Sequence, residues 1–128
     1  MADDSGHGGL QLLLTAGPLR LVADEPVALG GLDLGPTPHD LVAAALAACT
    51  AQTLRLYAGR KAWPLGPVRV EVIHRRDPAA TPADSFDRRT VLGGSLDADQ
   101  RARLLDIAKR CPIHLLLTAG ARVETALA

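Results

Sequence analysis

Residues 41–61, LVAAALAACTAQTLRLYAGRK, are rich in alanine and leucine and predict the main helix of the fold. Immediately before them, Thr37 suits an N-cap, Pro38 suits the first helical position, and Asp40 completes a capping-box-like pattern with Thr37. No proline interrupts the chain from there to about Arg60. The expected helix is therefore on the order of 30 Å long at 1.5 Å per residue, enough to cross a small domain.

Short extended segments before this helix predict an antiparallel meander. Turns that contain glycine, proline or acidic residues separate them, and they comprise residues 10–17, 19–24 and 27–31. The first residues, 1–9 (MADDSGHGG), are acidic and glycine-rich, lack the pattern of a signal peptide, and are expected to be flexible.

The segments after the long helix predict two more strands, a second helix and a final strand. Residues 67–76 alternate apolar and polar positions, which is typical of a half-buried strand, and residues 86–95 form its expected partner. Asp97 opens a helix that runs to about Arg110, with an apolar stripe of Leu104, Leu105, Ile107 and Ala108. Pro112 breaks this helix, residues 113–117 are compatible with a further helical turn, and residues 121–127 are expected to form a strand. This order predicts an α+β fold, with residues 10–128 as a single domain.

The composition excludes several classes of function. With 14 basic and 14 acidic residues, the chain has no charge excess that would favour nucleic acid or an anionic membrane. Its few aromatic residues, Tyr57, Trp63 and Phe86, are too few for a base-stacking platform. No uninterrupted apolar run approaches the length of a membrane span, so a cytoplasmic location with free thiols is expected.

Cys49, in the middle of the predicted long helix, has two interpretations. At 100° per residue, its helical face is mainly apolar and includes Val42, Ala45, Leu46, Thr53 and Leu56. Free cysteine is among the most buried residue types, so Cys49 could be a small apolar core residue. It could also be a nucleophile that requires a dry pocket, although the apolar stripe by itself favours the core position.

Cys111, the other cysteine, stands where the second helix ends and Pro112 begins. His114 follows three residues later and could stabilise a thiolate by a hydrogen bond or by its charge. The Cys-x-x-His spacing is half of a zinc signature, but no second pair completes it, so a structural zinc site is a weak alternative. Two thiols on separate helices could also meet as a peroxide-reacting cysteine and its resolving partner.

Two stretches, GPTPHDLVAAALAACT (35–50) and LLDIAKRCPIH (104–114), resemble the OsmC/Ohr family of thiol-dependent hydroperoxide reductases. The resemblance covers roughly residues 20–128. Residues 53–65 are more similar to the general OsmC-like branch of the family than to its organic-hydroperoxide-resistance branch. It implies an intertwined homodimer with antiparallel sheets wrapped around two central helices and active sites at the subunit interface. It also implies that Cys49 and Cys111 are the reactive pair.

The supporting residues of the family match this sequence less closely. The hydroperoxide-resistance branch has a glutamate directly after the proline that opens the long helix, whereas this chain has His39 there, followed by Asp40. The family also uses an arginine from the N-terminal strands, and Arg20 is the candidate for it. Arg20 is equally compatible with an ordinary solvated strand position.

The resemblance implies the following chemistry. A thiolate at Cys49, stabilised by Arg20, His39 or Arg55 in that order, attacks an organic hydroperoxide and becomes a sulfenic acid. Cys111 then closes a disulfide, which an external dithiol reduces. No metal or organic cofactor is expected, because the chain has no phosphate-binding or dinucleotide-binding glycine motif. The alternative is a non-catalytic dimeric protein that binds an apolar small molecule at the subunit interface.

Overall fold

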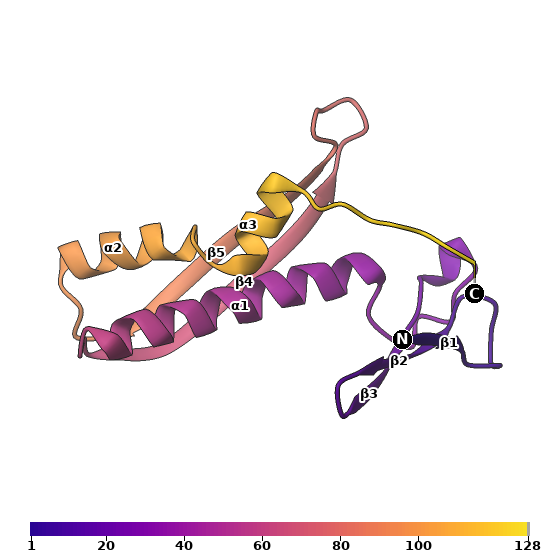
Figure 1. Cartoon of the computed structure of the whole chain (residues 1–128), viewed down its shortest axis with the longest axis horizontal. Coiled ribbons are helices and arrows are strands. Elements are labelled where there is room, and N and C mark those ends of the chain that lie inside the picture. The colour runs from indigo at the N-terminus through magenta and orange to yellow at the C-terminus, as the bar shows by residue number, and fades with distance from the viewer. Residues whose placement is uncertain (128) are drawn as a thin grey trace. The chain divides into compact units, whose positions relative to one another are not determined.

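The long helix expected from the sequence is present as α1, Pro38–Arg60 (Figure 1). In the computed structural model, which describes residues 1–127, the predicted capping pattern closes its first turn. The Asp40 N–H donates to the Thr37 hydroxyl at 3.1 Å, and the Thr37 N–H donates to the Asp40 carboxylate at 3.0 Å. The chain divides into two compact units, Met1–Ala43 and Ala44–Ala128, and the boundary falls within α1.

The N-terminal unit contains a three-stranded antiparallel sheet in the order β1-β2-β3. The strands are β1 (Ala2–Asp4), β2 (Leu12–Ala16) and β3 (Leu19–Ala23). Strand β1 lies in the segment that was expected to be flexible. Its backbone pairs with that of β2, from Ala2 opposite Leu14 to Asp4 opposite Leu12, and this pairing gives the segment regular structure.

One predicted strand of this unit is wrong. Residues Val27–Leu29 form a 3-10 helix, η1, instead of the third strand of a meander. Pro26 starts the turn, since its carbonyl accepts the N–H of Leu29 at 2.9 Å. Gly30 ends it in the left-handed region at φ 93°, which a glycine adopts without steric cost.

The C-terminal unit combines a long hairpin with three helical segments. Strand β4 (Leu65–Arg76) pairs with β5 (Asp84–Gly94) in antiparallel register, as the alternation predicted. Helix α2 (Ala98–Ala108) begins with a complete capping box between Asp97 and Gln100, and α3 (Pro112–Ala119) follows it. Antiparallel sheets and three helices confirm the predicted α+β fold class.

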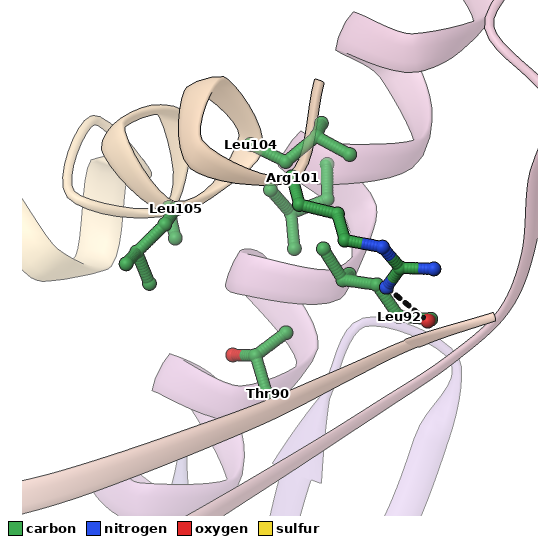
Figure 2. Close-up of a pocket in the computed structure, with 7 residues that line it drawn as sticks. Thr90, Leu92, Arg101, Leu104 and Leu105 are labelled. Atoms are coloured by element: carbon green, nitrogen blue, oxygen red, sulfur yellow. Dashed lines mark hydrogen bonds between the residues drawn. The ribbon is translucent and has the colours of Figure 1, made fainter. Parts of the chain in front are cut away.

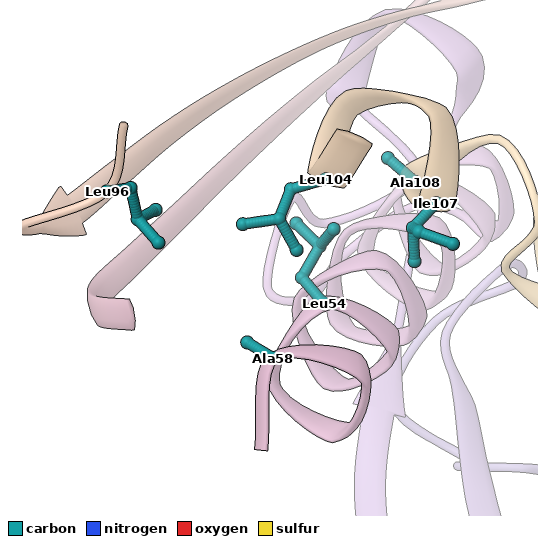
Figure 3. Packing of buried hydrophobic residues seen from close by; sticks show 6 residues of the cluster. All are labelled: Leu54, Ala58, Leu96, Leu104, Ile107 and Ala108. Carbon is teal, nitrogen blue, oxygen red and sulfur yellow. The ribbon is translucent and has the colours of Figure 1, made fainter. Parts of the chain in front are cut away.

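The core of this unit joins α1 to α2 (Figure 3). Leu104 is fully buried and lies against Leu54 of α1 and Leu96, which precedes α2. Of the predicted apolar stripe, Leu105 is an exception because its side chain is 59% exposed. The predicted final strand is also absent. Gly120 ends α3 at φ 75°, and residues 121–127 are exposed and pair with no strand among the described residues.

Helix α1 is long and apolar enough to cross a membrane by length and composition, with a mean hydropathy of 1.3 over an 18-residue window. No apolar segment of that length was expected from the sequence. Length and composition are weak grounds for a membrane span, because the core helix of a soluble protein meets the same criteria. In this structure Leu54 and Ala58 of α1 are buried against α2, and 28% of the apolar window of α1 is buried.

Candidate thiol site

Cys111 caps the N-terminus of α3. Its extended backbone, φ −64° and ψ 137°, is the conformation that a following proline favours, and Pro112 occupies the first turn of α3. The backbone N–H of His114 donates to Cys111 Sγ at 3.3 Å. The sulfur therefore takes the place that a serine or aspartate oxygen usually holds at an N-cap. The side chain is fully buried.

Cys49 lies near the middle of α1 and is half-buried. Its thiol interacts with three groups: the Cys111 thiol, the backbone N–H of Ile113 and the hydroxyl of Thr53. The Ile113 N–H also interacts with Cys111. The first turn of α3 therefore presents backbone N–H groups to both sulfurs, and two cysteines that are distant in the sequence are neighbours in the structure.

A buried threonine links this pair to an arginine of the hairpin. Thr50 donates from Oγ1 to the Leu46 carbonyl at 2.7 Å, and the same Oγ1 lies 3.7 Å from Cys111 Sγ. The Arg88 guanidinium donates to Thr50 Oγ1 at 2.9 Å and to the Ala108 carbonyl at 3.0 Å. Arg88 therefore connects β5, α1 and the end of α2 beside the thiols.

The two thiols have opposite pKa shifts. Burial raises the pKa of Cys49, and the neighbouring Cys111 adds to this effect against the hydrogen bond from the Ile113 N–H. Burial also opposes ionisation of Cys111, but the hydrogen bonds from the His114 N–H, Cys49 and Thr50 outweigh it and lower the pKa. The surroundings of Cys111, at the start of α3, therefore favour its thiolate form, whereas those of Cys49 favour the protonated thiol.

The structure clarifies the role predicted for His114. Its backbone N–H makes the hydrogen bond to Cys111 that the sequence analysis considered. Its imidazole is different, because burial and the positive charges of Arg88 and Lys109 lower the pKa of the ring. The neutral form of the ring is favoured, so the backbone of His114, rather than a charged imidazolium, stabilises the sulfur.

The other predicted supporting residues are exposed. Arg55 is exposed on α1, and at 100° per residue its position lies about 120° around the helix axis from Cys49. Arg20 is exposed on β3, and His39 and Asp40 are exposed in the first turn of α1. These three residues belong to the N-terminal unit, and their roles stay predictions.

Thr50 and Arg88 are site residues that the sequence analysis missed. A signal for Arg88 is present in the alternation of β5. Phe86, Thr90 and Leu92 share its parity along the strand, and all of them are partly buried. A charged residue at an inward-facing position of a strand requires a polar partner, and Thr50 is that partner. For Thr50, the corresponding signal was that this polar residue directly follows Cys49 in the apolar helix.

Two cavities lie in the C-terminal unit. One has a volume of about 480 Å³, and neither cysteine lines it. It is linked to the thiol site through His114, whose backbone N–H donates to Cys111, and Leu46, whose carbonyl accepts the Thr50 hydroxyl. Phe86, Leu117 and several polar residues complete its lining. The other has a volume of about 250 Å³ and lies between α1, α2 and β5 (Figure 2). Arg101 lies at its edge and donates to the Leu92 carbonyl at 2.9 Å. The larger cavity falls in the size range of small-molecule sites.

The candidate site is therefore a pair of free thiols, one on α1 and one at the start of α3, in an α+β fold. The family model described as OsmC-like protein matches residues 30–126, so the chain belongs to the OsmC-like protein family. No curated protein matches the chain.

Solved structures agree with this fold. A putative osmotic stress induced and detoxification response protein from Psychrobacter arcticus is 18% identical with a TM-score of 0.74, covering 89% of this chain and 83% of its own. An organic hydroperoxide resistance protein OsmC from Legionella pneumophila is 24% identical with a TM-score of 0.67, covering 91% and 85%. A putative organic hydroperoxide resistance protein from Vibrio cholerae, with captopril bound in one of its active sites, is 20% identical with a TM-score of 0.67, covering 91% and 81%.

Proposed function

We propose that this protein is a thiol-dependent peroxidase that reduces organic hydroperoxides, with Cys49 as the attacking thiol and Cys111 as the resolving thiol. The observation that carries the proposal is the proximity of two thiols from separate helices, close enough to affect each other's pKa, one half-buried and one fully buried. Solved structures of organic hydroperoxide resistance proteins with the same fold support it.

The reaction has two oxidative steps. Sγ of Cys49 attacks the distal peroxide oxygen, the O–O bond breaks, and the alcohol leaves with the proton, so that Cys49 becomes a sulfenic acid. Cys111 then attacks the sulfenic sulfur, water leaves, and a disulfide forms. Arg20, His39 and Arg55 remain the candidate cations for the Cys49 thiolate.

The larger cavity supports an organic substrate. Its apolar lining residues, including Leu46, Phe86 and Leu117, would contact the hydrocarbon part of a hydroperoxide. Apolar contact stabilises such a group relative to water, whereas hydrogen peroxide has no apolar part to bind. We therefore expect a higher kcat/KM for a bulky organic hydroperoxide than for hydrogen peroxide.

The test is intact mass spectrometry of the reduced protein after treatment with cumene hydroperoxide. The wild type is expected to lose two hydrogens as the disulfide forms, and Cys111→Ser is expected to accumulate a sulfenic acid that dimedone traps. Cys49→Ser is the matched control and should acquire neither modification. If both thiols of a folded wild type stay free in excess hydroperoxide, the peroxidase proposal is wrong.

A second candidate function is binding without catalysis, and the smaller cavity favours it. That cavity is lined mainly by apolar side chains, among them Leu54, Leu92 and Leu104, and none of its lining residues contacts either thiol in the described structure. Alkylation kinetics separate the two functions: a binding protein should have slowly reacting thiols, and a peroxidase should have a rapidly reacting Cys49.

We also propose that the protein is a homodimer that works in a reducing, cytoplasmic compartment with a dithiol as its reductant. Large apolar side chains on the described surface of the C-terminal unit support the dimer, since Leu56, Val91 and Leu105 are each about 60% exposed. Light scattering coupled to size exclusion tests it, and a mass of one 13.4 kDa chain would contradict it.

A further inference from the structure

The two sulfurs of the thiol site differ in their access to solvent. Cys111 is fully buried at the start of α3, whereas Cys49 is half-buried. A reductant must approach one sulfur of a disulfide from outside, opposite the bond that breaks. If the two residues are joined with little rearrangement of the helices, Cys49 is the sulfur that an external thiolate can reach.

The same two sulfurs differ in the groups that would receive a leaving thiolate. Cys111 accepts the His114 N–H and lies 3.7 Å from the Thr50 hydroxyl, at the N-terminus of a helix that favours negative charge. These interactions lower the pKa of Cys111 and leave that of Cys49 raised. In thiol–disulfide exchange, the thiol with the lower pKa leaves faster.

The hydroxyl of Thr50 is oriented so that it can donate a hydrogen bond to a Cys111 thiolate. Arg88 donates to Oγ1, so the hydroxyl hydrogen is directed away from the guanidinium. It is now given to the Leu46 carbonyl at 2.7 Å, and Cys111 Sγ is the other acceptor within reach. As negative charge grows on the leaving sulfur, the hydrogen can turn to it, because a charged acceptor makes the stronger hydrogen bond.

We propose that the reductive half of the cycle has a fixed direction: the reductant attacks Cys49, and Cys111 is the leaving group. Thr50 stabilises the leaving sulfur with its hydroxyl, and Arg88 is a positioning residue that acts through Thr50. This inference rests on the proposed function, in which the two cysteines form a disulfide.

The bonds balance as follows. One thiolate of a dithiol attacks Cys49 Sγ, the bond between Cys49 and Cys111 breaks, and its electron pair leaves with Cys111 as a thiolate. A mixed disulfide between the reductant and Cys49 results. The second thiol of the reductant then attacks the reductant sulfur that is bonded to Cys49. The bond to Cys49 breaks, Cys49 leaves as a thiolate, and the dithiol becomes a cyclic disulfide.

The first experiment locates the attacked sulfur in the wild type. The disulfide is made with diamide, a thiol oxidant that is not a peroxide, and is then exposed briefly to 2-mercaptoethanol, quenched with acid and mapped by peptide mass spectrometry. The mercaptoethanol adduct is expected on Cys49. An adduct mainly on Cys111, an equal mixture, or no disulfide after diamide would overturn the inference.

The second experiment measures the rate at which dithiothreitol reduces the disulfide made with diamide. Thr50→Val keeps the shape of the side chain without its hydroxyl, and Thr50→Ser restores the hydroxyl. We expect Thr50→Val to be slower by about threefold or more, the effect of roughly one pKa unit at the leaving thiol, and Thr50→Ser to recover the wild-type rate. Equal rates for the wild type and Thr50→Val would overturn the role of Thr50.

The outcomes separate the inference from the proposed function. Both experiments start from a disulfide made without peroxide, so a protein that fails to react with hydroperoxides can still show a fixed direction of reduction. Should Thr50→Val fail to fold, by circular dichroism, the adduct mapping in the wild type still decides which sulfur is attacked.

Discussion

The middle of α1 and the start of α3 each hold one cysteine, and the two regions shift the pKa of the thiol in opposite directions. In α1 the backbone amides are bonded within the helix, so burial of Cys49 dominates and raises the pKa. At the start of α3 the first N–H groups have no partner within the helix, and Cys111 accepts one of them. Cys111 also accepts hydrogen bonds from Thr50 and Cys49, so the hydrogen bonds that each sulfur accepts, weighed against its burial, set the direction of its pKa shift.

The largest expected effect comes from the core that holds α2 against α1. Leu104 is fully buried there, and Leu104→Ala should lower the free energy of unfolding by about 2–5 kcal/mol, since it leaves a cavity. Urea denaturation measures the change. Arg110→Ala is the control, because that side chain is exposed just beyond the end of α2 and its loss should cost under about 1 kcal/mol. Equal losses in the two variants would contradict this packing.

A smaller effect is expected at the arginine between the two regions. Arg88→Gln removes hydrogen bonds to Thr50 and to the Ala108 carbonyl, and should lower the free energy of unfolding by about 1–3 kcal/mol. The matched control is Arg89→Gln on the same strand, an exposed residue whose replacement should change stability by no more than about 0.5 kcal/mol. If both variants unfold at the same urea concentration as the wild type, the bridging role of Arg88 is wrong.

The opposite pKa shifts can be tested by removing one thiol at a time. In Cys111→Ala, the pKa of Cys49 should fall below its wild-type value, because the neighbouring sulfur that raises it is gone. In Cys49→Ala, the pKa of Cys111 should rise, since a hydrogen bond that lowers it is lost. Ultraviolet absorbance of the thiolate, followed against pH, gives both values. Shifts in the reverse directions would contradict the effect that each thiol is expected to have on the pKa of the other.

The smallest expected effect is on stability at alkaline pH. The folded-state pKa of Cys111 is below the ordinary thiol value of 9.0, so its contribution is fully present above that value and is lost as pH falls through the folded pKa. Cys49 has the opposite sign: its contribution is present below 9.0 and declines as pH rises toward its raised folded pKa. Relative to the wild type, Cys49→Ala should therefore gain stability as pH rises through 9. Urea denaturation at a series of pH values measures it, and a parallel decline in both proteins would contradict the assignment.

The sequence by itself determined most of the local structure. The capping residues Thr37 and Asp40, the absence of proline to Arg60, and the box between Asp97 and Gln100 placed the two longer helices, because these signals act over a few residues. Alternation placed β4 and β5 for the same reason. Where the prediction failed, at residues 27–31 and 121–127, a strand needed a distant partner that no local pattern specifies.

Only the tertiary structure decided what surrounds each sulfur. Nothing in the sequence near Cys111 indicates that Arg88 and Thr50 stand beside it, because this contact depends on the packing of β5, α1 and α2. Nor could the pattern around Cys49 reveal that its partner would be the more acidic thiol. The sequence supplied two cysteines and their helices, whereas their relative pKa depends on which unpaired N–H groups and hydroxyls folding brings within hydrogen-bonding distance.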